Sequence, residues 1–318
     1  MRKITLGKTG IEISVLGLGT MYFGSKLDER TSFRLMDLYQ EHGGNFLDSA
    51  NKYASWLPGC KGGESEMLIG RWLKRKGRAA DLVVATKVGF PYGDVPRSLK
   101  KEIIISECEL SLQRLGVECI DLYFAHAYDS ETPIEESMEA FYQLKKAGKI
   151  RHVGASNFLA WRLEEANSQA TSKDWEGFCC LQQRYTYLEP SIRAEFGNQQ
   201  VLTPGEVDFC REREISLMAY SPLLGGIYGK QKAALPLQYQ SLANEQKMAS
   251  LRALTSKTPF TANQLVLSWM LHSSPQVIPL VTGSNEKQLN ENLESVSISL
   301  TSEDMNLLDG PLVEPNTY

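Results

Sequence analysis

Short apolar runs alternate with longer amphipathic stretches along almost the whole chain. The apolar runs, rich in β-branched residues and leucine, occupy residues 15–19, 45–50, 81–89, 119–127, 150–156, 178–185, 215–223 and 277–281. Apolar residues at helical spacing, or helix start and stop signals, mark residues 28–43, 63–77, 98–116, 133–148, 158–170, 203–214, 261–271 and 285–295. This alternation predicts repeated strand–helix units, which form a parallel sheet with right-handed crossovers.

The number of units favours a closed (β/α)8 TIM barrel over an open sheet. The alternative is a doubly wound sheet, whose dinucleotide-binding variant opens with G-x-G-x-x-G after its first strand. Here Gly17 and Gly19 are followed by Gly24, which comes too late for that motif. Barrels often reach the length of this chain, 318 residues, as one unit, so we expect a single barrel domain over residues 1–318.

Two further elements are expected outside the strand–helix series. The first 14 residues form two short alternating runs around the sequence GKTG, which predicts a β-hairpin that would plug the bottom of the barrel. Near the other terminus, Thr301 is soon followed by acidic residues, a pattern typical of a capped C-terminal helix.

Composition excludes several classes of protein. The net charge of −4, without a long basic run, argues against a nucleic-acid or acidic-membrane partner. No run of about 18 apolar residues predicts a membrane span, and the first 20 residues lack the apolar core of a signal peptide. The six cysteines have no CxxC spacing and are expected to be reduced thiols in the cytoplasm; adjacent Cys179 and Cys180 are not expected to bridge.

Polar residues stand where three successive predicted strands end. Asp48 ends the second strand, Lys87 the third and His126 the fourth, while Tyr53 lies in the loop after Asp48. Each alone has an ordinary structural explanation, as a cap, a solvated charge, a structural histidine or a surface aromatic. The carboxyl ends of barrel strands meet at one rim, so the four are expected to lie together at a reaction site. A metal site is not expected, because none of the four histidines has ligand spacing.

These residue types suit proton transfer to a carbonyl oxygen. An unperturbed phenol has a pKa of about 10, and a nearby cation should lower it. We therefore expect Lys87, held by Asp48, to lower the pKa of Tyr53, so that Tyr53 becomes a general acid–base group and His126 orients the substrate. No strong nucleophile is present, which argues against a barrel hydrolase, and a hydride would have to come from a cofactor.

The chain resembles the aldo-keto reductase superfamily over nearly its whole length. The stretches LGKTGIEISVLGLGTMYFG, FLDSANKY with GGESEMLIGRWL, ATKVG, DLYFAH, IRHVGASNF, MAYSPLLGG and TGSNEKQLNEN resemble family motifs. The resemblance implies an NADP(H)-dependent oxidoreductase with Asp48, Tyr53, Lys87 and His126 as its catalytic residues. It also implies these cofactor-binding residues: Gly19, Thr20, Met21, Asp48, Ser156, Asn157, Gln182, Tyr220, Ser221, Pro222, Leu223, Gly225, Gly283, Ser284, Gln288, Glu291 and Asn292.

The chain departs from the family pattern in two places. The adenosine stretch offers only Lys287 as a cation for the 2′-phosphate of NADP, with Lys230 as a second candidate, so NAD(H) stays open. The segment between Tyr53 and Glu64 is longer than the short glycine turn common there. Some relatives are channel-associated subunits, so a cofactor-sensing binding protein is the alternative to an enzyme. The oligomeric state is not indicated.

The long segment after Tyr53 is expected to form a wall of the substrate pocket. It contains Trp56, although this indole could instead cover the edge of the barrel. The other pocket candidates are Tyr22, Tyr128 and Phe158. An aromatic wall with polar tips suits a sugar-like carbonyl compound, but it would also suit an aromatic ketone.

Overall fold

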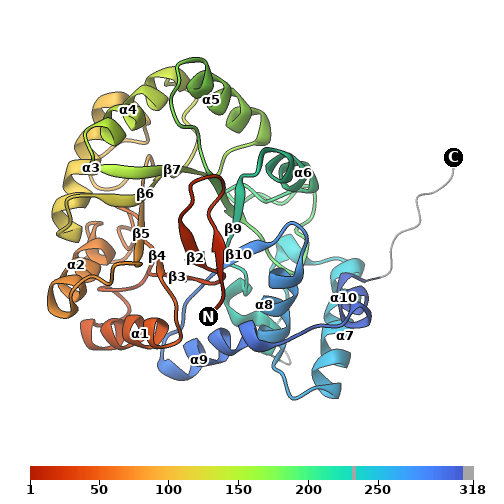
Figure 1. The fold of residues 1–318 in the computed structure, drawn as a ribbon. Helices are drawn as coiled ribbons and strands as arrows, with labels where there is room; N and C mark the ends of the chain where they lie inside the picture. Colours follow the sequence, from red (N-terminus) through yellow and green to blue (C-terminus); the bar gives the residue numbers. More distant parts are fainter. Residues whose placement is uncertain (231–233, 311–318) are drawn as a thin grey trace, which may run out of the picture.

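A computed structural model of the chain, which describes residues 1–230 and 234–310, contains a closed barrel of eight parallel strands (Figure 1). The strands follow the chain order around the barrel, and β10 closes it against β3. Their bounds are β3 Gly17–Gly19, β4 Phe46–Asp48, β5 Val83–Val88, β6 Ile120–Ala125, β7 Ile150–Ser156, β8 Cys180–Arg184, β9 Ser216–Tyr220 and β10 Val277–Val281. The predicted TIM barrel is therefore confirmed.

Helices surround the barrel in Figure 1, and most lie where the sequence pattern predicts them. They are α1 Glu29–Glu41, α2 Glu64–Lys76, α3 Lys101–Leu115, α4 Ile134–Lys146, α5 Ala160–Ser172, α6 Pro204–Arg213, α8 Ala262–His272 and α9 Glu286–Glu294. Local chemistry sets their ends: the Asp28 carboxylate accepts a 2.8 Å hydrogen bond from the backbone N–H of Thr31 at the start of α1. Thr203 and Glu206 form a capping box at the start of α6.

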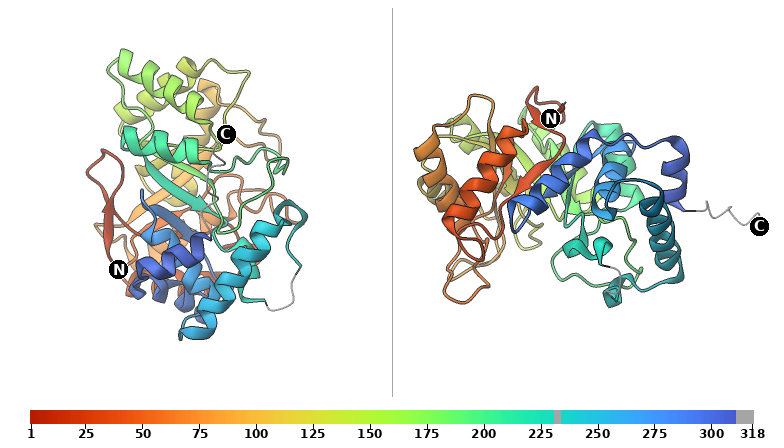
Figure 2. Two further views of the ribbon diagram at one scale, coloured as in Figure 1. Left: turned by 90° about the vertical axis from the view of Figure 1, so that its right-hand side faces the viewer. Right: turned by 90° about the horizontal axis from the view of Figure 1, so that it is seen from below.

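The predicted hairpin consists of β1 (Lys3–Thr5) and β2 (Glu12–Ser14), paired antiparallel. It lies across one end of the barrel (Figures 1 and 2), where Leu6 and Ile13 pack into the same cluster as the interior side chains Phe46, Phe124 and Met218. Gly7 permits this close approach, because a Cβ atom there would lie 2.4 Å from the carbonyl oxygen of Cys179. The hairpin therefore plugs the bottom of the barrel and leaves the carboxyl ends of the strands for the site.

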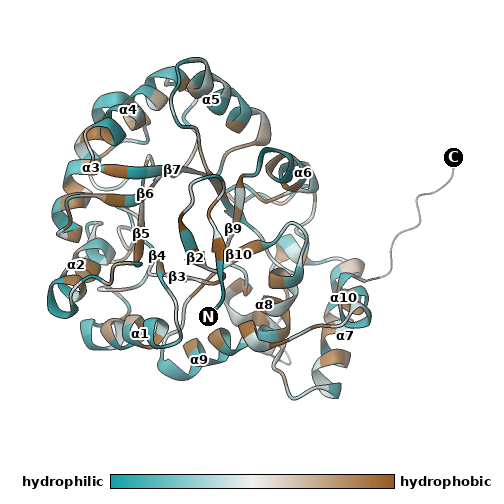
Figure 3. Ribbon diagram, viewed as in Figure 1, coloured by the Kyte–Doolittle hydropathy of each residue, from teal (hydrophilic) through white to brown (hydrophobic). Residues whose placement is uncertain are grey.

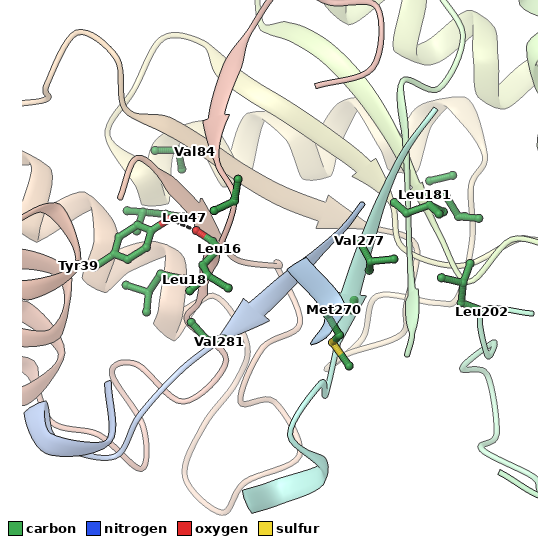
Figure 4. Packing of buried hydrophobic residues seen from close by; sticks show 14 of the residues in the cluster. Leu16, Leu18, Tyr39, Leu47, Val84, Leu181, Leu202, Met270, Val277 and Val281 are labelled. Carbon is green, nitrogen blue, oxygen red and sulfur yellow. Dashed lines mark hydrogen bonds between the residues drawn. The ribbon is translucent and has the colours of Figure 1, made fainter. Parts of the chain in front are cut away.

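A second, larger apolar layer lies between the strands and the helices. The strands are mostly brown in the hydropathy colouring of Figure 3, whereas the helices carry both teal and brown stretches. In Figure 4 the side chains of Leu18, Leu47 and Val281 lie in this layer, close to Tyr39 of α1. The buried Tyr39 hydroxyl donates a 2.6 Å hydrogen bond to the carbonyl oxygen of Leu16, so the one polar atom of the ring is satisfied.

The outermost helices include one that the sequence pattern did not reveal. Helix α7 (Leu242–Lys257) packs against α10 (Ser302–Asp309), the predicted C-terminal helix, outside the barrel (Figure 2). Only a few of its residues are buried, so its apolar periodicity is weak. Three 3₁₀ segments, η1 Leu224–Gly229, η2 Leu237–Tyr239 and η3 Ser295–Ser297, complete the described elements. Among the described residues, no helix is long and apolar enough to cross a membrane.

Candidate active site

The four residues singled out at the strand ends do lie together. Asp48 is the last residue of β4, Lys87 precedes the last residue of β5, and His126 directly follows β6. The three strands are neighbours in the barrel. Two tight turns after β4, closed by hydrogen bonds from Tyr53 N–H to the Ala50 carbonyl and from Ser55 N–H to the Lys52 carbonyl, return Tyr53 over them.

Asp48, Lys87 and Tyr53 form one hydrogen-bonded group. The Lys87 ammonium donates to Asp48 Oδ2 at 2.6 Å, to the Tyr53 hydroxyl at 3.0 Å and to the Ser49 carbonyl at 2.7 Å. The Tyr53 hydroxyl donates to Asp48 Oδ2 at 3.2 Å, and Gln182 Nε2 donates to Oδ1 at 2.9 Å. Lys87 is fully buried and Asp48 is 1% exposed. The ammonium therefore has three fixed partners in a site from which water is excluded.

The expected lowering of the pKa of Tyr53 by Lys87 is wrong. Burial, followed by the negative charge of Asp48, raises the pKa of the Tyr53 phenol well above its ordinary value. The physical reason is that desolvation is the main influence on the phenol, and the Asp48 carboxylate, which accepts its hydrogen bond at 3.2 Å, also favours the protonated form. Burial also lowers the pKa of the Lys87 ammonium, although Asp48 opposes this. The phenol is therefore protonated at neutral pH, as a proton donor must be.

His126 lies beside this group as a neutral imidazole. Its ring centroid is 6.1 Å from that of Tyr53 and 4.4 Å from that of Phe90, in edge-to-face arrangements. Burial, and then the charges of Lys87 and Lys52, lower the pKa of His126 well below its ordinary value. Its buried Nδ1 atom has no hydrogen-bond partner among the described residues. A buried ring nitrogen without a partner remains available to a bound molecule.

The next three strands bring several of the predicted cofactor-binding residues to the same rim. Ser156 ends β7, Gln182 lies in β8 and Tyr220 ends β9. Asn157 links the end of β6 to the end of β9. Its Nδ2 donates to the His126 carbonyl at 2.8 Å, and its Oδ1 accepts from the Tyr220 hydroxyl at 2.8 Å. Its φ of 58° is unusual for a residue other than glycine and indicates a constrained turn.

The loops after β9 and β10 are shaped by their backbone. Ser221, Leu224 and Gly225 have positive φ values of 58°, 47° and 68°, and Pro222 and Leu223 lie between them. Gly283 is required after β10, because a Cβ atom there would lie 2.8 Å from the backbone nitrogen of Leu289 at the start of α9. This tight loop leads directly into the N-terminus of a helix, where anions are stabilised.

The remaining predicted cofactor residues are distributed around these loops. Ser284 and Lys287 are exposed, as is Lys230 after η1, and the Ser284 N–H donates to Gln288 Oε1 at 2.8 Å. Glu291 and Asn292 already have protein partners, namely the Thr261 hydroxyl and the Thr282 carbonyl. Gly19 ends β3, and Thr20 and Met21, which follow it, pass close to Asp48, because the Thr20 hydroxyl donates to the Asp48 carbonyl at 2.8 Å.

Three of the four predicted pocket residues have rings that are at least partly exposed. Trp56 is 49% exposed, and Tyr22 and Tyr128 are intermediate. A cation lies over each ring: Lys52 over Trp56 at 5.7 Å, Lys26 over Tyr22 at 4.4 Å and Arg162 over Tyr128 at 4.2 Å. Phe158 is a correction: its ring is completely buried between Tyr128 and Phe178, so it supports the wall from behind.

The described residues contain no group of three or more histidine, cysteine, aspartate or glutamate side chains that could hold a metal ion. All six cysteines are free. The chemistry available at this rim is therefore a half-buried, protonated phenol in contact with a buried ammonium–carboxylate pair, beside a neutral imidazole.

A sequence model of the Aldo/keto reductase family matches residues 15–312. The chain belongs to this family. It is 32% identical to the uncharacterized oxidoreductase YrpG of Bacillus subtilis, over 96% of this chain and 94% of that protein. It is 28% identical to a probable voltage-gated potassium channel subunit beta of Arabidopsis thaliana, over 94% of this chain and 92% of that protein.

A solved structure agrees with this assignment. The thermostable aldo-keto reductase Tm1743, crystallised with the inhibitor epalrestat, matches with a TM-score of 0.77 and 29% identity, over 97% of this chain and 99% of that one. Together with the family match and the oxidoreductase name of YrpG, this identifies the chain as an oxidoreductase of the aldo-keto reductase type.

Two neighbours of the site in this aldo-keto reductase were not found from the sequence. Lys52, directly before Tyr53, has its ammonium 4.4 Å from the centre of the Phe90 ring. Phe90 follows β5 and packs on His126. In the sequence, only their positions near Tyr53 and Lys87 could have pointed to these two residues, because lysine and phenylalanine are not unusual in a loop. That Lys52 has no carboxylate partner among the described residues can be seen only in the folded chain.

Proposed function

We propose that this chain is a nicotinamide-dependent carbonyl reductase in which Tyr53 is the general acid, or the general base in the reverse reaction. The observation that carries the proposal is the hydrogen-bonded group of Asp48, Lys87 and Tyr53, with neutral His126 beside it, at the carboxyl ends of the strands. In barrel enzymes the reaction site lies at this end.

Each side chain has a definite task in this proposal. His126 donates a hydrogen bond to the substrate oxygen and so orients it, because its ring is neutral and one nitrogen has no protein partner. Tyr53 transfers its proton to the same oxygen as negative charge develops there. The resulting phenolate is stabilised by the Lys87 ammonium 3.0 Å away. Asp48 keeps that ammonium in place.

The cofactor is a nicotinamide dinucleotide, which supplies the hydride when bound. Ser156, Asn157 and Gln182 would hold the carboxamide, and Tyr220, fixed by Asn157, would support the ring. The backbone from Ser221 to Gly225 would surround the pyrophosphate. Two observations fit this ligand: the tight Gly283 loop leads into the N-terminus of α9, and the neighbouring Ser284 and Lys287 are exposed.

NADP(H) is the preferred form in this proposal, and Lys230 or Lys287 would contact its 2′-phosphate. Both lysines are exposed, and each lies in one of the two predicted cofactor loops. A phosphate group carries up to two negative charges at neutral pH, so a single ammonium within reach can distinguish NADP(H) from NAD(H).

The proposed substrate is a small carbonyl compound, with a sugar-like compound as the specific suggestion. The three accessible rings of Tyr22, Trp56 and Tyr128 support this, because aromatic faces stack on the C–H faces of polyols. They also fit an aromatic ketone. A cytoplasmic location belongs to the same proposal, supported by the six free thiols.

A second candidate function is cofactor sensing by a binding subunit without a metabolic substrate. The similarity to the potassium channel subunit beta of Arabidopsis thaliana favours it. The two functions differ in one measurable property, because a sensing subunit would bind the dinucleotide without sustained substrate turnover.

The test measures oxidation of NADPH and of NADH with sugars, aliphatic aldehydes, aromatic aldehydes and ketones. Steady turnover of at least one carbonyl class supports the reductase. Tight dinucleotide binding without turnover of any class would favour the sensing subunit instead. Activity on sugars alone would support the proposal of a sugar-like substrate. Activity confined to aromatic ketones would contradict that proposal.

A further inference from the structure

Lys52 has an unusual environment for a lysine beside a reaction site. The side chain is half-buried, and its ammonium lies over the faces of Phe90, at 4.4 Å, and Trp56, at 5.7 Å. Within residues 1–230 and 234–310 it forms no ion pair and donates no hydrogen bond to another side chain or carbonyl group. Most other half-buried cations among the described residues have a carboxylate partner, as Lys101 has Glu139 and Lys149 has Glu109.

An ammonium group has three N–H donors, and partial burial without an anion is unfavourable. Aromatic faces compensate only in part, by about 0.5–2 kcal/mol in general. Burial lowers the pKa of Lys52, which agrees with an incompletely compensated charge. The donors of Lys52 are thus available to an anion that arrives from outside the chain.

The position of Lys52 relates it to the reacting atoms. Phe90 contacts both Lys52 and His126, because the centre of its ring lies 4.4 Å from the ammonium and 4.4 Å from the centre of the imidazole. The charge of Lys52 also contributes to the field at His126. Both groups lie 4.4 Å from the centre of the same ring, so the Lys52 ammonium is at most about 9 Å from the centre of the His126 ring. The far end of a molecule whose carbonyl oxygen is held by His126 would therefore be within reach of Lys52.

We propose that Lys52 is a specificity-determining residue that binds a carboxylate on the carbonyl substrate. This rests on the proposed reductase function and narrows its substrate class to carbonyl compounds with one negative charge. A single carboxylate matches the single charge of Lys52, whereas a phosphate monoester would bring nearly two charges. The Trp56 and Phe90 rings would contact the apolar body between the carbonyl group and the carboxylate.

The experiment compares 4-carboxybenzaldehyde with its neutral methyl ester, methyl 4-formylbenzoate, in the parent protein and in Lys52→Met. Methionine keeps an unbranched side chain of similar length and removes the charge. We expect kcat/KM for the carboxylate substrate to fall about tenfold, mainly through KM, as for loss of one charge-assisted hydrogen bond. We expect the ester to change by less than about twofold, because no charged contact is lost.

Three further variants separate charge from structure. Lys52→Arg keeps the charge and should retain the preference for the carboxylate substrate, whereas Lys52→Glu should weaken it beyond Lys52→Met. Lys61→Met, an exposed lysine of the same loop, is the matched control and should leave the ratio unchanged. Higher salt should reduce the preference in the parent and in Lys52→Arg, but not in Lys52→Met.

Two results for Lys52→Met would overturn the inference. One is an unchanged kcat/KM for both substrates. The other is an equal loss of kcat/KM for both, which would mean a structural role. If the parent turns over neither substrate nor any other carbonyl compound, the proposed reductase function fails separately. Calorimetric binding of benzoate against benzamide, with dinucleotide present, then decides the role of Lys52. Benzoate binding that Lys52→Met leaves unchanged would refute it.

Discussion

The rim of the barrel has two halves that are built differently. Around the ends of β4, β5 and β6, the polar side chains are buried and bonded to one another, with Lys87 at 0% and Asp48 at 1% exposure. Around the loops after β9 and β10, the lysines are exposed, and the shape comes from the backbone, through positive φ values and the crowded Gly283.

The difference shows how each half acquires its chemistry. In the first half, desolvation strengthens every charge interaction, so the geometry of the reacting groups is fixed before any ligand arrives. In the second half, water still solvates the charged groups, and a ligand would replace that water. Substitutions in the first half should therefore change turnover and stability, whereas those in the second should change affinity.

The largest expected effect is that of Tyr53→Phe. This change keeps the ring and removes the proton, so turnover of the best carbonyl substrate should fall by about 10²–10⁴-fold, the usual contribution of general acid catalysis. Dinucleotide affinity, measured by fluorescence titration, should be retained. Tyr142→Phe, at a half-buried tyrosine of α4 that stacks on Trp175, is the matched control. Near-normal turnover in Tyr53→Phe would contradict the role.

Lys87→Met should lose activity and also destabilise the protein. It leaves the Asp48 carboxylate buried without a cation, so the free energy of unfolding in urea should fall by about 3–5 kcal/mol. Adding Asp48→Asn removes the unpaired charge and should restore part of the stability but none of the activity. If Lys87→Met unfolds at the parental urea concentration, the two halves do not differ in the way described.

In the second half, Lys230→Ala and Lys287→Ala test the proposed contact with the 2′-phosphate. At least one should weaken NADPH binding by about tenfold, as for loss of one charge-assisted contact, while NADH binding stays the same. Unfolding in urea should not change, because both side chains are exposed. Equal affinity of the parent for both dinucleotides, or no effect of either substitution, would refute the assignment.

Trp56→Ala should have the smallest effect. The indole is 49% exposed, and its loss should raise KM for the best substrate by about three- to tenfold, the range of one aromatic contact. NADPH affinity should be unchanged, because Trp56 lies in the loop after β4 and the predicted dinucleotide residues lie on other strands and loops. An unchanged KM would mean that the exposed ring does not contact substrate.

Local signals explain which elements could be predicted from the sequence. Strand β5 and helices α1 and α6 were found because their apolar patterns and caps depend on residues a few positions apart. Helix α7 was missed because it packs on α10, far along the chain, and buries only a narrow face. Phe158 was assigned to the pocket because a pattern cannot tell a ring at a rim from a ring behind it.

The sequence by itself determined the barrel and the identity of the four residues at its rim, because strand order places successive strand ends side by side. Only the tertiary structure decided how these residues behave. The raised pKa of Tyr53 depends on burial and on the Asp48 carboxylate, whose position is fixed by Lys87, 39 residues away in the chain. The missing partner of Lys52 depends on the loops that pack around it. The burial of a charged group and its pairing with a distant residue arise only when the chain folds, so a local sequence pattern does not predict them.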